Sequence, residues 1–292
     1  MANSRELKKS IKTVSSTKKI TSTMEMVATA KSKKAYDRIH ALAPYASKLK
    51  ELMGDMSAVG SVDHPLLRSP EIARHVTFVV ITSNRGLCGG FNANLLRNFV
   101  KRYKQVKDEG TEIELVVIGK KGNGFFKFAG IKVDHAHTDL DDTVTYSRTE
   151  EIVDYLIDSF VDEKTDRVEI HSNRVKSSAT TLMSESVLLP LQLEESVEKG
   201  DSGAQANVDY LFSPDPKTIL VNLLPLAVKT NFYREVIDSM AAELIARRLA
   251  MKNATDAATD MVKDLSRVYN RTRQAAITQE IAEIVGGVEA LK

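Results

Sequence analysis

The sequence predicts an α/β domain inserted between two very long helices, one near each end of the chain. The distribution of glycine and proline carries this prediction, because neither residue occurs before Pro44 or from Leu226 to Val285. At 1.5 Å per residue, the second stretch alone could form a rod of roughly 90 Å. Globular helices average about 11–12 residues, so such stretches indicate a coiled coil, a membrane span or a helical repeat.

The C-terminal stretch carries a seam of residues at alternating steps of three and four. The seam consists of Ile237, Met240, Leu244, Arg247, Met251, Ala254, Ala258, Met261, Leu265, Val268, Thr272 and Ala275. A seven-residue repeat sustained this long predicts a coiled coil with a left-handed supercoil. We therefore expect residues 209–292 to form a coiled-coil helix, which Pro225 bends or breaks near its start.

The N-terminal stretch carries a matching but more polar seam, and residues 1–57 are predicted to form its helix. The seam consists of Leu7, Ile11, Val14, Lys18, Thr21, Glu25, Ala28, Ser32, Ala35, Ile39 and Leu42, followed by Ala46, Leu49, Met53 and Met56. Pro44 is expected to kink this helix. Two seams on one chain can satisfy each other, which favours antiparallel pairing of the first and last helices within the molecule. Self-dimerisation through the C-terminal seam is the alternative.

Strands and helices alternate between the two long helices, over residues 75–195. Strands are expected at His75–Thr82, Glu112–Ile118, Ile131–His137, Arg167–Ser172 and Thr180–Leu189, and helices at Phe91–Lys107 and Arg148–Phe160. This alternation predicts a mostly parallel sheet with helices on both faces, which is a Rossmann-like arrangement.

Charge is distributed unevenly along a chain whose net charge is only +2. Residues 1–38 contain ten Lys or Arg against three acids, whereas residues 134–163 contain ten acids against one base. The basic end is therefore expected near acidic groups. The single cysteine, Cys88, excludes a disulfide framework and fits a reducing compartment. No apolar stretch approaches the roughly 20 residues that cross a bilayer, and no secretory signal is evident.

Two glycine-rich turns resemble phosphate-binding loops without matching them. The segment Asn84–Phe91 follows a strand and opens a helix, but its glycine spacing is not that of the dinucleotide-binding motif. Gly119–Gly124 lacks the spacing and the final hydroxyl of a P-loop. Tight structural turns are the favoured interpretation of both, with phosphate binding as the alternative for the first. The first turn could also present Arg85 and Cys88 to a protein partner.

The sequence offers no convincing active site. His135 and His137 lie on one face of a predicted strand near Asp139, but two histidines without a third ligand in register favour a solvated loop over a metal site. One cysteine and scattered histidines do not indicate a nucleophile. No catalytic, cofactor-binding or metal-binding residue is predicted.

The C-terminal end of the chain is unusually apolar for a helix. From Ala275 onwards its apolar residues point in nearly all directions, and such a helix must be buried all round. If the N-terminal helix does not extend as far as this end of the C-terminal helix, the tip projects alone. It then needs a binding site formed by other chains. The alternative is that it folds back onto its own domain. The basic N-terminal helix could bind nucleic acid, but a solvated basic face is favoured.

Four blocks of this sequence closely resemble the gamma subunit of F-type ATP synthases. Tyr269–Ile281 resembles the C-terminal signature of that family, and Thr17–Thr21 followed by Met24–Ala28 resembles its N-terminal signature. Arg85–Gly90 and Ala250–Asp256 resemble two further blocks, and the resemblance runs from end to end in register. Asn84 departs from the pattern, because many members of the family have Asp there.

The resemblance implies a non-catalytic rotor shaft of a proton-translocating ATP synthase, which couples rotation of the membrane ring to conformational change in the catalytic beta subunits. The implied partners are three alpha and three beta subunits, the epsilon subunit and the membrane ring of c subunits, with no cofactor. The implied location is the cytoplasmic face of a bacterial inner membrane, as a peripheral subunit. By position, the contacts with beta-subunit loops near the tip fall on Arg273, Gln274, Thr278 and Glu283.

Five other positions acquire implied roles from the same resemblance. Met24 and Arg248 correspond to the neck of the shaft, and Arg85 and Cys88 to the segment that faces an acidic lever of beta. Tyr210 falls in the foot region that meets the membrane ring and epsilon. Two rival hypotheses remain: a free-standing coiled-coil adaptor or nucleic-acid binder, and a nucleotide-dependent enzyme built on the middle domain.

Overall fold

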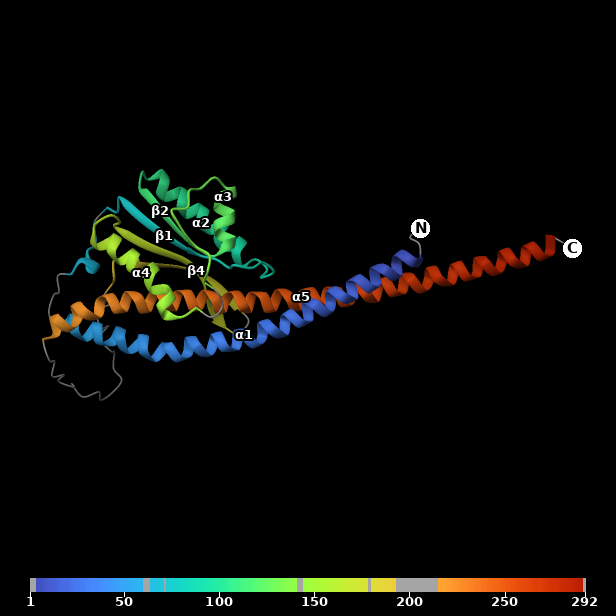
Figure 1. The fold of residues 1–292 in the computed structure, drawn as a ribbon, viewed down its shortest axis with the longest axis horizontal. Helices are drawn as coiled ribbons and strands as arrows, with labels where there is room; N and C mark the ends of the chain where they lie inside the picture. The colour runs from blue at the N-terminus through green and yellow to red at the C-terminus, as the bar shows by residue number, and fades with distance from the viewer. Residues whose placement is uncertain are drawn as a thin grey trace, which may run out of the picture. The chain divides into compact units, whose positions relative to one another are not determined.

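The computed structural model describes residues 4–59, 64–70, 72–140, 144–177, 180–192 and 215–290 of the chain (Figure 1). The chain divides into two compact units. One unit contains residues 1–30 and 247–292, and the other contains residues 31–246. The described helices include none that is long and apolar enough to span a membrane.

A five-stranded sheet forms the centre of the unit made by residues 31–246. In chain order, the strands are β1 (His75–Ile81), β2 (Glu112–Ile118), β3 (His135–His137), β4 (Arg167–Ser177) and β5 (Thr180–Leu189). Their order across the sheet is β3-β2-β1-β4-β5, and only β5 is antiparallel to its neighbour. This is the mostly parallel, doubly wound arrangement that the alternation of elements predicted.

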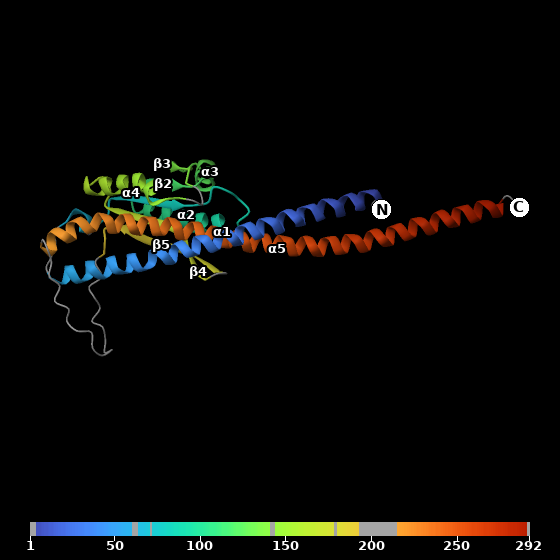
Figure 2. The same ribbon diagram turned by 60° about the horizontal axis from the view of Figure 1, so that its bottom comes forward.

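Helices cover both faces of this sheet, as Figure 2 shows. On one face lie α2 (Phe91–Asp108) and α3 (Lys120–Phe128), which bury Phe99 and Phe126 against Phe78 of β1. The other face is covered by α4 (Tyr146–Val161) and the first part of α5 (Pro216–Ala290). The central strands are therefore buried on both sides, which explains their continuous apolar runs.

The two long helices are α1 (Ser4–Val59) and α5, and each contains a proline at which a kink, bend or break is expected. Neither helix ends there: α5 is helical on both sides of Pro225, so it is not broken, and α1 is helical on both sides of Pro44. Proline removes one helical hydrogen bond, but packing on either side maintains the helix. Leu49 follows Pro44, Leu224 precedes Pro225, and both leucines are buried in the same core.

The unit of residues 1–30 and 247–292 is an antiparallel pair of helices, the two being the start of α1 and the end of α5 (Figure 1). The hydroxyls of Thr21 and Thr255 lie 2.8 Å apart, within hydrogen-bonding distance. Leu7, Ala28 and Ala258 are buried in the same seam. The head and tail of one chain therefore pair with each other, as favoured over self-dimerisation.

The predicted seam of α5 is wrong at Met261 and Val268, whereas Leu265 and Thr272 are half-buried as predicted. Met261 and Val268 are 54% and 49% exposed, whereas their neighbours Val262 and Tyr269 are half-buried. Steps of three and four can alternate in either order, and an ideal helix drifts relative to a strict seven-residue repeat. Val262 and Tyr269 therefore occupy the seam in place of Met261 and Val268.

Three other boundaries differ from expectation. The strand predicted over Ile131–His137 is only three residues long, and the strand predicted to end at Ser172 extends to Ser177, where it forms a hairpin with β5. Helix α5 begins at Pro216 rather than at residue 209, and residues 209–214 lie outside the described part of the chain. Helix α3 was expected only as a turn that leads into a helix.

The corrected seam can be tested with two adjacent residues. Val262→Asp places a charge in the half-buried seam and should lower the free energy of unfolding by about 1–3 kcal/mol. Met261→Asp changes an exposed side chain and should stay within about 0.5 kcal/mol of the parent. Thermal melting followed by circular dichroism compares the two variants. The reverse order of stability would restore the original seam.

A buried carboxylate makes the stability of the sheet unit depend on pH. Burial alone would raise the pKa of Glu169, but the His171 ring, whose Nε2 lies 3.7 Å from Glu169 Oε2, the hydrogen bond from Arg102, and the charges of Arg102 and Arg167 lower that pKa to about 2. The Glu169 Oε1 lies 3.0 Å from Arg102 Nη2. A lowered pKa stabilises the folded state above the unfolded-state value of 4.5, and that stability is lost as the pH falls toward 2.

Glu169→Gln should therefore lower the free energy of unfolding by about 3 kcal/mol at pH 7 and by progressively less as the pH falls from 4.5 toward 2. Urea unfolding at several pH values measures the difference. Glu112→Gln is the matched control, because the Glu112 side chain is 83% exposed in its pair with His75. Equal effects of the two substitutions at pH 7 would contradict this account.

Candidate functional site

The end of α5 presents an apolar surface to solvent. Every described side chain from Arg273 to Val288 is exposed. The large apolar side chains among them are Ile277, Ile281, Ile284, Val285 and Val288, which are 47–68% exposed. Exposed apolar groups that follow one another along a helix mark an interaction surface more often than scattered single ones.

The exposure begins where the pairing with α1 ends. Counting outward in antiparallel fashion from the Thr21–Thr255 pair places Ser4, the first described residue of α1, opposite Thr272. Thr272 is also the last half-buried residue of α5. The segment that follows Thr272, which we call the tip, therefore has no helical partner among the described residues. This agrees with a tip that projects alone and disagrees with one that folds back.

The structure gathers four of the predicted contact residues on this tip. Arg273, Gln274, Thr278 and Glu283 are all exposed. The Thr278 hydroxyl donates to the Gln274 carbonyl at 3.0 Å, and the Gln279 side chain donates to Glu283 at 2.9 Å. These bonds stay within the helix, so the outer surfaces of the side chains remain available to a partner. The contacts themselves remain a prediction.

The two predicted neck residues lie in the same helical pair. Met24 and Arg248 are both half-buried, and the antiparallel register places them within about one helical turn of each other. Sequence reasoning did not single out Ile20 and Met26, which are 61% and 62% exposed on the same stretch of α1. Their apolar character outside the seam was the signal that could have identified them.

The turn after β1 is closed by hydrogen bonds between Ser83, which precedes it, and Asn92 of α2, which follows it. Ser83 N–H donates to Asn92 Oδ1 at 3.0 Å, and Asn92 Nδ2 donates to Ser83 Oγ at 2.7 Å. Cys88 packs with Phe91 and Ala242, and its side chain is only 3% exposed. The Cys88 side chain therefore fills a small core, and the partner contact expected at this residue remains a prediction. Arg85 is exposed, as expected.

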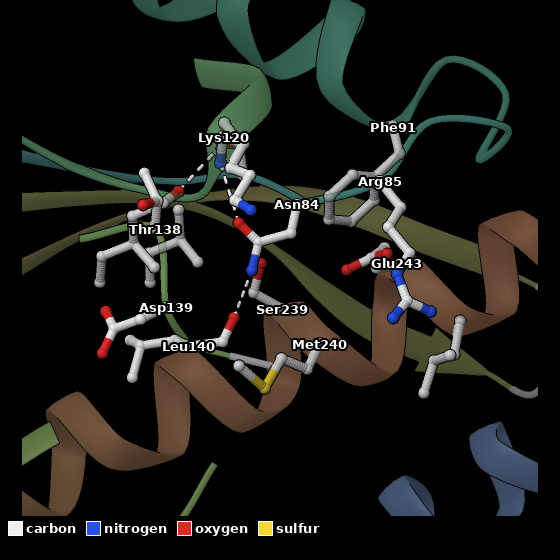
Figure 3. Close-up of a pocket in the computed structure, with 14 residues that line it drawn as sticks. Asn84, Arg85, Phe91, Lys120, Thr138, Asp139, Leu140, Ser239, Met240 and Glu243 are labelled. Carbon is white, nitrogen blue, oxygen red and sulfur yellow. Dashed lines mark hydrogen bonds between the residues drawn. The ribbon is translucent and has the colours of Figure 1, made fainter. Parts of the chain in front are cut away.

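A cavity of about 300 Å³ lies beside this turn, at the carboxyl ends of β1 and β2 (Figure 3). Its charged lining consists of Arg85, Lys120, Asp139 and Glu243, two cations and two acids. Asp139 also pairs with Arg148 at 3.6 Å. A lining of balanced charge favours no anionic or cationic ligand, so the cavity does not support phosphate binding.

Asn84 joins the elements around this cavity. Its Oδ1 accepts the Lys120 N–H at 2.9 Å, and its Nδ2 donates to the Leu140 carbonyl (Figure 3). The asparagine therefore uses both ends of its amide group, whereas an ionised aspartate in its place could not donate to that carbonyl. The departure from the family pattern at this position thus has a local structural role.

The backbone of the Gly119–Gly124 turn packs against, and bonds to, neighbouring groups of the same chain. The first amides of α3 are already engaged: Lys121 N–H donates to the Ser83 carbonyl, and Gly122 N–H donates to Thr82 Oγ1. Gly119 has a φ of +101°, and a Cβ there would lie 2.2 Å from the Thr82 carbonyl oxygen. The glycines are needed for close packing of backbone, which confirms the structural turn.

The two histidines of β3 do not form a metal site among the described residues, which contain no cluster of three potential ligands. His135 Nε2 lies 3.3 Å from Glu114 Oε1, and the His135 ring packs on Tyr155. Burial lowers the pKa of His137. Tyr210 lies outside the described residues, so its predicted role is not placed.

Two glycines of this turn provide a matched test of its packing. Gly119→Ala should destabilise the protein by about 3 kcal/mol or more, because the added methyl group meets backbone at a strained φ. Gly124→Ala meets open space within α3 and should stabilise it by about 0.5–1 kcal/mol. Urea unfolding measures both changes. A tolerated Gly119→Ala would show that the turn does not require this close approach.

Comparisons with known proteins agree with these features. The family model described as ATP synthase matches residues 3–291. The ATP synthase gamma chain of Leptospira biflexa is 48% identical over 292 residues, which cover the whole of both chains. The ATP synthase gamma chain of Gemmatimonas aurantiaca is 40% identical over 293 residues, again with full coverage of both chains.

Solved structures of low sequence identity share the fold. A chain of the Tetrahymena thermophila mitochondrial ATP synthase central stalk and c-ring is 22% identical with a TM-score of 0.60, over 80% of this chain and 99% of that one. A chain of the Euglena gracilis mitochondrial ATP synthase rotor is 18% identical with a TM-score of 0.61, over 94% and 98%. On the family match and the two relatives of 48% and 40% identity, this chain belongs to the ATP synthase gamma chain family.

Proposed function

We propose that this protein is the central rotor shaft of a rotary ATP synthase and is itself non-catalytic. The observation that carries the proposal is the exposed apolar tip beyond Thr272, which α1 leaves uncovered. Burying those side chains in water-free surroundings is favourable, at about 25 cal/mol per Å² of apolar surface. A ring of other subunits that encloses the tip would provide such surroundings.

The helical pair suits a part that transmits torque. Two helices that pack along a continuous seam resist twisting better than one helix, because a twist must displace the side chains of both. At the tip, apolar side chains such as Ala275, Ala276 and Ile277 form no hydrogen bonds with a partner. Such a surface can rotate inside a ring of surrounding subunits without breaking specific hydrogen bonds at every step.

The charge distribution indicates the electrostatic character of the surrounding partners. Arg267, Arg271 and Arg273 are exposed just before and at the start of the tip. The exposed lysines of α1 add to this positive charge, which attracts acidic surfaces and speeds association at low salt. Acidic elements of the enclosing subunits are the expected counterparts.

The proposed partners are three alpha and three beta subunits, an epsilon subunit and a membrane ring of c subunits. The ATP chemistry then resides in the beta subunits, and turning of the shaft imposes unequal conformations on them. The resemblance supports proton translocation and a peripheral position on the cytoplasmic face of a bacterial inner membrane. The relatives named ATP synthase gamma chain and the fold shared with rotor structures support this assembly.

The tip residues provide the direct test of this proposal. Deletion of Ile277–Lys292, or the double substitution Arg273→Ala with Gln274→Ala, should weaken assembly with alpha and beta subunits by at least roughly 30-fold, since a single anchor residue of an interface contributes about 2 kcal/mol. ATP hydrolysis by the reconstituted mixture measures the loss. Lys107→Ala, at an exposed position of α2, is the control.

Two results would contradict the proposal in different ways. If the variants activate hydrolysis as well as the parent chain, the tip is not the contact surface. If the parent chain neither assembles with alpha and beta subunits nor changes their hydrolysis, the shaft function itself is wrong. Hydrolysis of ATP by the isolated chain would instead favour an enzyme built on the sheet unit.

A further inference from the structure

The first part of α5, over residues 216–246, lies on the sheet through a row of apolar side chains. Leu220, Leu224, Val228 and Phe232 follow one another at four-residue intervals, and all four are fully buried. Such a contact holds the helix and the sheet together because separation would expose apolar surface. It is not directional, however, so by itself it does little to stop the helix from rolling about its axis.

The carboxylate of Glu235, at the edge of this row, adds directional hydrogen bonds to the contact between helix and sheet. Ser172 Oγ of β4 donates to Glu235 Oε2 at 2.8 Å, and Ser186 Oγ of β5 donates to Glu235 Oε1 at 3.2 Å. Ser172 has no exposed surface, so water does not compete for its hydroxyl. One side chain of α5 therefore holds two neighbouring strands through hydrogen bonds to a charged acceptor, which are stronger than neutral ones.

A second polar contact holds the same part of α5 from another direction. Lys229 Nζ lies 2.8 Å from Asp154 Oδ1 and 3.8 Å from Glu150 Oε1, both on α4. Its hydrogen bond to Asp154 raises the pKa of Lys229, so the amine stays charged. Lys229 and Glu235 are six residues apart, which sets them about 120° apart around the helix axis.

We infer that Glu235, supported by Lys229, is a positioning residue that fixes the rotational setting of α5 on the sheet. This inference rests on the proposed function and adds to it that torque passes between the sheet unit and the shaft through α5. Because α5 is one continuous helix from Pro216 to Ala290, a helix that cannot roll on the sheet carries that torque onward. Without the hydrogen bonds of Glu235, part of the applied rotation would be lost, because α5 would roll about its own axis on the apolar face of the sheet.

The test uses the assembled complex with its alpha and beta subunits fixed to a surface. A bead is attached through Lys107→Cys on α2, which labels selectively because the native Cys88 is buried. Glu235→Leu removes both hydrogen bonds, and Ser172→Ala combined with Ser186→Ala removes them from the sheet side. Glu235→Gln is the conservative variant, because its amide can accept from one hydroxyl and donate to the other.

Both disruptive variants should broaden the angular distribution of the bead during pauses, at an unchanged rate of ATP hydrolysis, whereas Glu235→Gln should restore the parent distribution. Ser184→Ala is the matched control, since Ser184 is also buried on β5 but is not bonded to Glu235. In the isolated chain, Glu235→Leu should lower the melting temperature by about 2–4 °C.

An angular distribution that stays at the parent width in both disruptive variants would overturn the inference. The serine double variant keeps the test valid if Glu235→Leu does not fold. A parent chain that fails to drive any rotation would overturn the proposed function instead, so the two failures are distinguishable. If Ser184→Ala broadens the angular distribution of the bead as much as the two disruptive variants do, that result would also count against a specific role of Glu235.

Discussion

The pairing of α1 with α5 is the interaction on which the rest of the structure depends. The Thr21 and Thr255 hydroxyls meet although they are 234 residues apart in the sequence. Closing so long a loop costs conformational entropy, and a long seam of small contacts offsets it. Alanine at Ala28 and Ala258 lets the two backbones approach closely, but each contact buries little surface. Stability therefore requires length, which accounts for a seam of many turns.

Helix α5 carries out two structural tasks with two kinds of side chain. Over residues 216–246 it covers the sheet with large residues such as Leu224 and Phe232. Beyond Arg247 its buried positions hold smaller or flexible residues, such as Ala258 and Met251, that suit a close helical partner. The change in side-chain size along one helix separates the part that anchors from the part that pairs.

Much of this architecture could be predicted from the sequence because its determinants are local. The absence of glycine and proline predicted the long helices, and β-branched runs gave the bounds of β2 and β5. The order of the strands and the partners of each helix depend on distant contacts and were less accessible. The seam phase failed at Met261 because Val262 beside it is equally apolar, so the pattern alone could not choose between them.

The candidate site was predictable in its exposed part and less so in its buried part. The apolar run from Ala275 indicated an interaction surface, since no local pattern explains it otherwise. The burial of Cys88 depends on Phe91 and on Ala242 of a distant helix, and spacing in the sequence does not reveal such a contact. The continuity of α5 through Pro225 likewise reflects tertiary packing that outweighs a local preference.

The hydrogen bond between Thr21 and Thr255 in the seam has a consequence for the length of the free end. A slip of α1 along α5 by one heptad would separate Thr21 from Thr255 and remove the hydrogen bond between the helices, so that each hydroxyl would keep only the bond within its own helix. The same slip would lengthen or shorten the overhang beyond α1 by about 10 Å. The Thr21 and Thr255 hydroxyls therefore help to set the length of the free end, because the register that they select determines how far the tip extends beyond α1.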